Sequence, residues 1–272
     1  MKLRRSVRHA SRRIAALTAA AAAAGLLVTA GVASSAHASA ARASVGTTTA
    51  SGPKPSIVLV HGAWADSSSW DAVAGQLQHD GYTVYVPPNP LLGIGYDSAF
   101  IRDFLHTISG PIILVGHSYG GAVITNAATG DKQVKALVYV DAFAPAQGQT
   151  IGQLVSACPG SCVLPPANVT SQPYPGAPAG AVDVYIKQDV FPSCMANGLP
   201  ASEASELAAT QRPLTSLALA QPSGVPAWKT IPSWARQAHA HITTISGAPH
   251  LSMISNPGIV TKVILAAVHA TS

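Results

Sequence analysis

Charged and aromatic residues are both scarce in this chain of 272 amino acids. Only 10% of the residues are charged and 6% are aromatic, whereas 48% are hydrophobic. Disordered chains have the opposite composition, with few apolar residues and many charged ones. The composition therefore excludes disorder for most of the chain and indicates a folded core.

Acidic residues are scarcer than basic ones, and the basic excess is confined to one end. The chain has 16 Lys and Arg against 11 Asp and Glu, which gives a net charge of +5. Six of the 16 basic residues fall within residues 1–13, and from residue 39 onward 10 basic residues stand against 11 acidic ones. A nearly neutral body has no extended basic surface, so we expect no nucleic-acid partner.

The first 38 residues have the order of a secretory signal peptide. Basic residues 1–13 precede an apolar, Ala-rich run at Ile14–Val32, and Ala36-His37-Ala38 has the form of a cleavage site. A retained membrane anchor is the alternative, because the run is almost long enough to span a bilayer. The weak hydrophobicity of the run favours cleavage. We therefore expect a secreted protein without stable membrane anchoring, exported by the Sec or the Tat route.

The remaining chain predicts one domain. Residues 39–53 are rich in Ser, Ala, Thr and Gly, a composition typical of a flexible lead-in. Residues 54–272 are enough for a single domain with a sizeable core.

The three cysteines, Cys158, Cys162 and Cys194, all lie in this expected domain. Exported proteins commonly form disulfides, and Cys158 with Cys162 would close a small loop around Pro159-Gly160. A bond from either of them to Cys194 is the alternative, and each pairing leaves one thiol over. The segment lacks further metal ligands, so we expect structural cysteines and no zinc site.

Hydrophobic patterns alternate between strand and helix over the first half of the domain. Short apolar runs predict strands at Ile57–Val60, Tyr82–Val86, Ile112–Val115 and Ala136–Val140. Amphipathic or small-residue stretches between them predict helices at Ser68–His79, Asp97–Ile108 and Gly121–Thr129. In the second of these helices, we expect Phe100, Phe104, Leu105 and Ile108 to form the buried face. Such alternation predicts a parallel sheet with right-handed crossovers.

The alternation stops between residues 144 and 230. This stretch is rich in proline and contains all three cysteines, and only Ser202–Thr210 in it has a clear helical pattern. We interpret it as a cap inserted into the domain. A strand at His241–Ile245 and a closing helix at Ile259–Val268 are predicted after it.

A nucleophile elbow is indicated by Gly116-His117-Ser118-Tyr119-Gly120. The motif follows a predicted strand and precedes a predicted helix, the setting in which glycines let the chain turn sharply and expose the serine hydroxyl. We therefore predict Ser118 as a nucleophile.

A serine nucleophile needs a base and donors for the oxyanion. His250 ends a turn just after the strand predicted at His241–Ile245, and a histidine near the C-terminus is the chain order that this elbow requires. The turn His61-Gly62-Ala63-Trp64 can present the Ala63 amide, and the second donor would be the amide of Tyr119. His61 is expected to shape this turn rather than to transfer protons.

These motifs resemble those of the small α/β-hydrolases that include plant methyl esterases, hydroxynitrile lyases and bacterial pyrethroid-hydrolase-like esterases. The resemblance is carried by residues 60–64, 115–122, 138–145 and 250–257. It implies an α/β-hydrolase fold, in which a mostly parallel open sheet is flanked by helices and carries an inserted cap.

The resemblance also implies roles for individual residues. It assigns Ser118 as nucleophile, His250 as base, and the Ala63 and Tyr119 amides as oxyanion donors. Hydroxynitrile lyases of this group carry Lys directly after the catalytic histidine, whereas this chain has Leu251. That difference favours ester hydrolysis.

The acidic member of a catalytic triad is missing from its usual place. The group normally has a strand, an acid-bearing loop and a helix before its last strand. Here only residues 235–240 separate Trp234 from the strand predicted at His241, and a parallel crossover needs about a dozen residues. In addition, no Asp or Glu occurs after Glu206.

Asp141 is the candidate substitute. It alone among the 11 acidic residues follows a predicted central strand, at the edge of the sheet where catalytic groups gather. Asp141 would orient His250 and stabilise its charged form; the alternative is that it only caps the turn into the cap segment.

We therefore predict a secreted serine hydrolase that cleaves small apolar carboxylic esters through an acyl-enzyme, with no cofactor and no metal. Its partner would be a small-molecule ester substrate. One alternative is a catalytically impaired hydrolase-like protein that only binds a small ligand. Another is a lyase of the hydroxynitrile type.

Overall fold

A computed structural model describes residues 53–157, 161–163, 165–229 and 241–271. The signal peptide predicted at residues 1–38 and nearly all of the predicted lead-in lie outside the described residues. Within the described residues, no helix is both long enough and apolar enough to cross a membrane.

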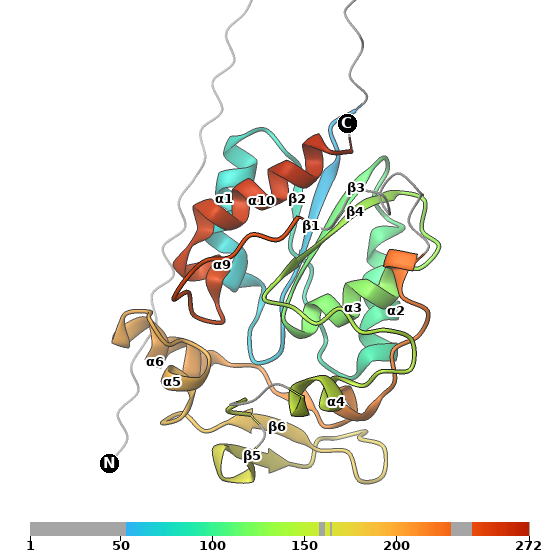
Figure 1. The fold of residues 1–272 in the computed structure, drawn as a ribbon. Coiled ribbons are helices and arrows are strands. Elements are labelled where there is room, and N and C mark those ends of the chain that lie inside the picture. The colour runs from blue at the N-terminus through green and yellow to red at the C-terminus, as the bar shows by residue number, and fades with distance from the viewer. Residues whose placement is uncertain (1–52, 158–160, 164, 230–240, 272) are drawn as a thin grey trace, which may run out of the picture. The chain divides into compact units, whose positions relative to one another are not determined.

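In the described part of the chain, the central sheet has four parallel strands, in the order β2-β1-β3-β4 (Figure 1). Their bounds are Ser56–Val60 for β1, Val84–Tyr85 for β2, Ile112–His117 for β3 and Val134–Val140 for β4. Every residue of β3 is buried, as expected of a strand covered on both faces. The predicted strand Tyr82–Val86 is reduced to two residues, because β2 is an edge strand that pairs only with Ile57 and Val58 of β1.

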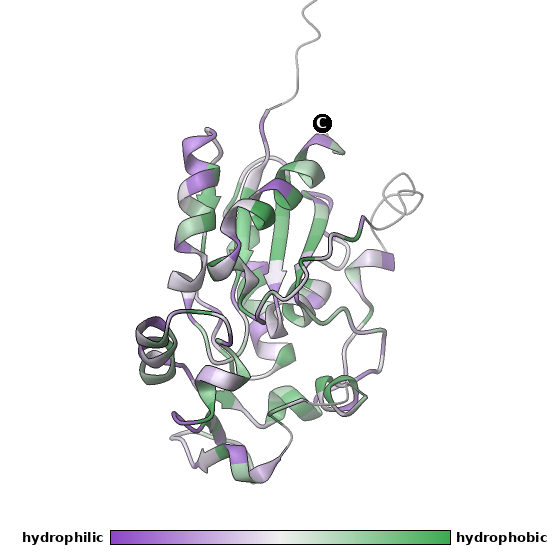
Figure 2. Cartoon of the chain, turned by 60° about the vertical axis from the view of Figure 1, so that its left-hand side comes forward, coloured by the Kyte–Doolittle hydropathy of each residue, from purple (hydrophilic) through white to green (hydrophobic). Residues whose placement is uncertain are grey.

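Helices cover both faces of this sheet. α1 (Asp71–His79) and α10 (Pro257–His269) pack together on one face, and α2 (Ile94–Leu105) and α3 (Tyr119–Ala127) pack together on the other (Figure 1). Figure 2 shows hydrophobic residues concentrated on the strands and hydrophilic residues on the outer sides of the helices. The predicted α/β class, with a parallel sheet flanked by helices, is confirmed.

One predicted helix is displaced in the structure, and part of its predicted buried face is wrong. The helix expected at Asp97–Ile108 begins earlier, at Ile94, and ends at Leu105. Phe100 was expected in the core but is 38% exposed. The residues that face the core are spaced three or four apart from the earlier start: Ile94, Asp97, Ser98, Ile101 and Leu105.

Between β4 and the C-terminal helices, the chain forms the cap. It contains a three-stranded antiparallel sheet of β5 (Val169–Gln172), β6 (Asp183–Ile186) and β7 (Leu214–Thr215). The cap helices are α4 (Ile151–Ser156), α5 (Phe191–Cys194), α6 (Ala201–Thr210) and α7 (Leu217–Ala220). α6 matches the predicted helix, whereas the cap sheet was not predicted. Its strands are short and contribute few buried residues, so they lack a strong alternating pattern.

The strand predicted at His241–Ile245 is wrong. Residues 241–245 belong to no strand, and Ile242 is 87% exposed. A further parallel strand beside β4 would have to bury its apolar side chains and satisfy its backbone there, which these exposed residues do not do. The chain continues through α9 (Ser252–Ser255) into α10, which contains the helix predicted at Ile259–Val268.

A disulfide joins Cys162 to Cys194 within the cap. This is one of the pairings with Cys194 that the sequence left open, and it excludes the Cys158–Cys162 bond. It closes a loop between residues 32 positions apart and ties the segment after α4 to the end of α5.

Removal of this disulfide is expected to destabilise the folded protein. In the chain-entropy account, a loop of this length contributes about 3.7 kcal/mol to the free energy of unfolding. A Cys162→Ala/Cys194→Ala double variant should therefore show a lower urea midpoint than the wild type. Cys158→Ala is the matched control, because the disulfide does not use that residue. Equal midpoints for the double variant and the control would contradict a stabilising role.

Candidate active site

Ser118 lies at the sharp turn between β3 and α3, in a backbone conformation that non-glycine residues rarely adopt. Its φ is 52° and its ψ is −121°. The two flanking glycines leave room for the turn. A Cβ atom on Gly116 would lie 2.6 Å from the Gly120 carbonyl oxygen. A Cβ atom on Gly120 would lie 2.5 Å from the Val60 carbonyl oxygen. The glycine pattern around Ser118 therefore has a steric cause.

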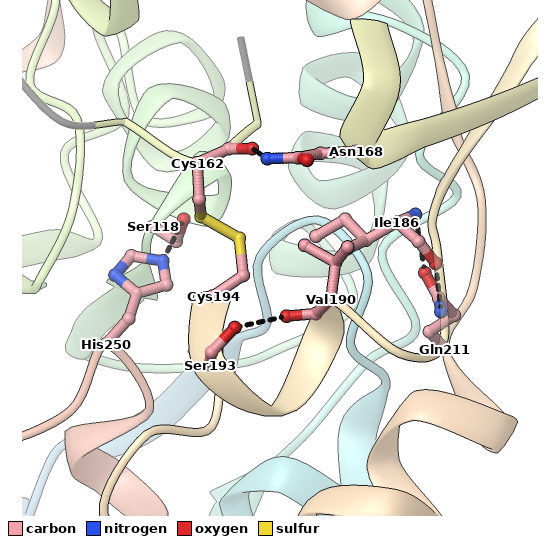
Figure 3. The surroundings of a disulfide bond; sticks show 9 residues. All are labelled: Ser118, Cys162, Asn168, Ile186, Val190, Ser193, Cys194, Gln211 and His250. Atoms are coloured by element: carbon pink, nitrogen blue, oxygen red, sulfur yellow. Dashed lines mark hydrogen bonds between the residues drawn. A yellow bond between two sulfur atoms is a disulfide. The ribbon is translucent and has the colours of Figure 1, made fainter. Parts of the chain in front are cut away.

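His250 contacts the serine. Its Nε2 atom is 2.9 Å from Ser118 Oγ, and Figure 3 shows the two side chains pointing toward each other. Burial lowers the pKa of His250, and the negative charge of Asp141 opposes this by raising it. The imidazole is therefore neutral at neutral pH and can accept the serine proton. The structure thus brings together the two side chains that the sequence singled out.

His117 holds the loop that carries His250. Its Nε2 atom donates to the carbonyl oxygen of His250 at 2.9 Å, while its Nδ1 atom is buried without a partner in the described chain. Burial holds the pKa of His117 well below its ordinary value, so the ring is neutral with its proton on Nε2. The residue directly before Ser118 thus fixes the backbone of the base.

Asp141 lies directly after β4, near His250 but without a direct bond to it. Its carboxylate accepts a hydrogen bond from the hydroxyl of Ser252, two residues after the histidine. The hydrogen bonds among the described residues do not include one between Asp141 and the His250 imidazole, although the two interact electrostatically. Asp141 also has a positive φ of 45° and is exposed. The structure places this carboxylate beside the serine–histidine pair, but not in the position of a bonded triad acid.

The turn predicted to supply an oxyanion donor packs directly against the serine. A Cβ atom on Gly62 would lie 2.7 Å from Ser118 Cβ, so the backbone of this turn reaches the nucleophile. In the described hydrogen bonds, the amides of Ala63 and Tyr119 donate to no other group. Both amides are therefore available to a ligand at the elbow.

His61 shapes this turn, as expected. It is fully buried, accepts a hydrogen bond on Nε2 from the Asn89 amide at 2.9 Å, and donates from Nδ1 to the Gly62 carbonyl oxygen at 2.9 Å. Burial lowers the pKa of His61 to about 4. With both ring nitrogens engaged, the ring has no free position for proton transfer.

The cap contacts the site at two points. The indole N–H of Trp64 donates to the carbonyl oxygen of Val184 in β6 at 2.9 Å. This bond links the turn formed by residues 61–64 to the cap sheet. The Cys162–Cys194 disulfide has the Ser118–His250 pair among its surroundings (Figure 3). Ser118 is only 5% exposed, so the cap leaves little of the nucleophile open to solvent.

Two contributors to the site were not foreseen from the sequence. His117 was considered only as part of the elbow motif, and Trp64 only as part of a turn. Each acts on a partner far away in the chain, so the sequence carries no local signal for it. Among the described residues, no group of three His, Cys, Asp or Glu side chains is placed to hold a metal ion.

Comparison with known proteins relates the chain to characterised enzymes. A profile of the alpha/beta hydrolase family matches residues 57–254. A carbendazim hydrolyzing esterase from Nocardioides sp. (strain SG-4G) is 35% identical over an alignment of 145 residues that covers 47% of this chain and 56% of that protein. The match thus spans little more than half the length of that relative.

Solved structures share the fold at low sequence identity. Tomato methylketone synthase I, in complex with 2-tridecanone, superposes with a TM-score of 0.66 at 17% identity over 81% of this chain and 100% of its own. A pyrethroid hydrolase from Sphingobium faniae JZ-2 superposes with a TM-score of 0.58 at 20% identity over 79% of this chain and 98% of its own. At these identities the likeness shows the fold alone.

Proposed function

The chain belongs to the alpha/beta hydrolase family, and on this premise we propose that it is a secreted esterase that cleaves small apolar carboxylic esters. The observation that carries the proposal is the hydrogen bond of 2.9 Å between Ser118 Oγ and His250 Nε2. A serine hydroxyl becomes a competent nucleophile when a neutral imidazole can take its proton. Here burial keeps that imidazole neutral by lowering its pKa.

The first half of the reaction forms the acyl-enzyme. Ser118 Oγ attacks the ester carbonyl carbon while its proton passes to His250 Nε2. The carbonyl oxygen becomes an oxyanion that accepts hydrogen bonds from the amides of Ala63 and Tyr119. The tetrahedral intermediate then collapses, the bond to the alcohol oxygen breaks, and His250 returns the proton to the departing alcohol.

The second half releases the acid. Water gives a proton to His250 and attacks the acyl carbon, and a second oxyanion forms at the same two amides. Its collapse breaks the bond to Ser118 Oγ, which takes the proton back from His250. Water is the only co-reactant, and no oxidant, reductant or metal is needed.

Two observations support an ester as the substrate. The relative from Nocardioides is named for ester hydrolysis, and the Sphingobium protein is named as a pyrethroid hydrolase. Leu251 follows the base where hydroxynitrile lyases of the resembling group carry Lys, which favours hydrolysis over the lyase reaction.

The secreted location has separate support. The order of basic, apolar and cleavage regions in residues 1–38 is that of a signal peptide. The disulfide between Cys162 and Cys194 fits an oxidising compartment, because cytosolic thiols are kept reduced.

A fluorophosphonate probe tests the proposed nucleophile. The purified wild-type protein is expected to be labelled with one probe per chain, with loss of fluoride and attachment of phosphorus to Ser118 Oγ. Intact-mass measurement followed by peptide mapping locates the label, and a heat-denatured sample is the control for chemical labelling without an active site. A folded protein that takes up no probe would overturn the proposal and favour the ligand-binding alternative.

A further inference from the structure

A buried carboxylate of α2 binds the residue that follows Ser118. Asp97 has no exposed surface, and its Oδ2 atom accepts a hydrogen bond of 2.8 Å from the hydroxyl of Tyr119. Oδ1 accepts from the Leu92 amide at 2.9 Å, and Oδ2 also accepts from the Gly93 amide at 3.3 Å. Burial of an unpartnered carboxylate is very costly, so these three donors fix where Asp97 can lie.

Tyr119 connects this carboxylate to the site. Its side chain is 1% exposed, and the residue begins α3 directly after the nucleophile. One end of Tyr119 is therefore held in the core by Asp97, while its amide is one of the two assigned to the oxyanion hole. A rotation of the residue that moved the amide would have to break or strain the bond to the carboxylate.

The segment bound by Asp97 also supports the other oxyanion donor. The backbone amide of Asn89 donates to His61 Nε2 at 2.9 Å, and the side-chain amide of Asn89 donates to the His61 carbonyl oxygen at 3.0 Å. His61 begins the turn that presents the Ala63 amide. Residues 89–97 thus contact both halves of the oxyanion hole.

The backbone of this segment is strained and needs the contacts that Asp97 makes. Leu91 has a φ of 64°, in the left-handed region that is unfavourable for a non-glycine residue. Such conformations persist only where surrounding contacts hold them in place. Two residues of the cap also hold this segment. Arg212 Nη1 donates to the Asn89 carbonyl oxygen at 3.2 Å, and the Thr215 amide donates to the Leu91 carbonyl oxygen at 3.0 Å.

We propose that Asp97 is a positioning residue for the oxyanion hole. It fixes the Tyr119 amide through the tyrosine side chain, and it fixes the Ala63 amide through the segment that binds His61. Oxyanion donors act at about 2.7–3.1 Å from the oxygen, and a misplacement of about 1 Å can lower a rate about 10²-fold. This inference rests on the proposed function, because it requires an oxyanion to form at Ser118.

Tyr119→Phe tests the proposal, with Tyr139→Phe as the matched control. Both changes remove one hydroxyl that bonds to another side chain. The hydroxyl of Tyr139 is paired with Thr125 Oγ1 at 2.8 Å, and neither of these groups is an oxyanion donor. For Tyr119→Phe we expect kcat on a short-chain aryl ester to fall by about 10-fold with KM within about twofold. For Tyr139→Phe we expect both constants to stay near the wild-type values.

A second readout separates positioning from a merely structural effect. An aryl trifluoromethyl ketone adds to Ser118 and forms an oxyanion, whereas a planar amide of similar shape binds without one. Tyr119→Phe is expected to weaken binding of the ketone by about 10-fold and to leave binding of the amide unchanged. Asp97→Asn, which keeps one acceptor oxygen but loses the charge, is the second variant, and the same direction of change is expected for it.

The outcomes distinguish this inference from the proposed function. If wild-type protein forms no ketone adduct, the proposed function fails. If wild-type protein forms the adduct but Tyr119→Phe and Asp97→Asn bind the ketone as tightly as Tyr139→Phe does, the positioning role is overturned while the function stands. Urea midpoints of all the variants show whether each is folded. If one of Tyr119→Phe and Asp97→Asn does not fold, the comparison with Tyr139→Phe uses the one that does.

Discussion

Ser118→Ala is expected to lower kcat/KM for a short-chain aryl ester by at least about 10⁴-fold. In the proposed mechanism, the change removes the atom that forms the acyl-enzyme and leaves His250 without the group that it deprotonates. Substrate binding should change little, because Ser118 is 5% exposed and differs from alanine by one oxygen. Steady-state kinetics, together with a binding measurement on a non-hydrolysable amide of the substrate, check both halves of this expectation.

Three further variants sharpen this result. His250→Ala is expected to lower kcat/KM by about as much as Ser118→Ala does. The double variant should lower it by no more than either single variant, because residues of one catalytic unit act non-additively. Ser193→Ala is the matched control. Among the described residues, the hydroxyl of this exposed cap serine bonds only to the Val190 carbonyl oxygen, and the residue lies in the surroundings of the same disulfide (Figure 3). Ester turnover that survives in Ser118→Ala at the level of Ser193→Ala would refute the assignment of the nucleophile.

The elbow could be predicted because its determinants are adjacent in the chain. Gly116 is required by contacts within the turn and Gly120 by the close approach of the Val60 backbone, and the strand and helix on either side are indicated by an apolar run and a small-residue stretch. His250 could be predicted for a related reason, since the order of serine before histidine narrows the choice. The hydrogen bond that holds the His250 backbone could not be predicted, because it comes from His117, 133 positions away in the chain.

Asp97 shows why local patterns mislead at such positions. In the sequence it precedes a helical periodicity, which is typical of a capping residue. In the structure the helix already begins at Ile94, and the carboxylate bonds back to the amides of Leu92 and Gly93 and across to Tyr119. A helix start three residues earlier is a small error in a boundary, but it changes the role of this side chain.

The strand predicted at His241–Ile245 failed for a reason of topology. Its four β-branched residues, Ile242 to Ile245, fit a strand, but whether such a segment joins a sheet depends on what lies beside the edge strand. Here β4 ends the described sheet on that side, and Ile242 is exposed. The missing acid-bearing unit had already indicated that this part of the chain departs from the resembling group.

Asp141→Asn is expected to lower kcat/KM by roughly 10- to 100-fold, less than the loss of about 10⁴-fold known for a bonded triad acid. The carboxylate of Asp141 is bonded to Ser252 rather than to His250, and it is exposed, so water weakens its influence. Its negative charge nevertheless raises the pKa of His250. It therefore stabilises the imidazolium that forms when Ser118 attacks, and the variant loses that stabilisation.

The pH profile separates this electrostatic role from a turn-capping one. His250 acts as a base only when it is neutral, so kcat/KM falls as pH decreases through the pKa of His250 in the free enzyme. Loss of the Asp141 charge lowers that pKa, and the acid limb of the profile should move to lower pH while the plateau drops. Asp131→Asn is the matched control, because Asp131 is a buried carboxylate just before β4, at the opposite end of the strand from Asp141. A reduced plateau with an unshifted acid limb would mean that Asp141 acts only through the turn that it shapes with Ser252.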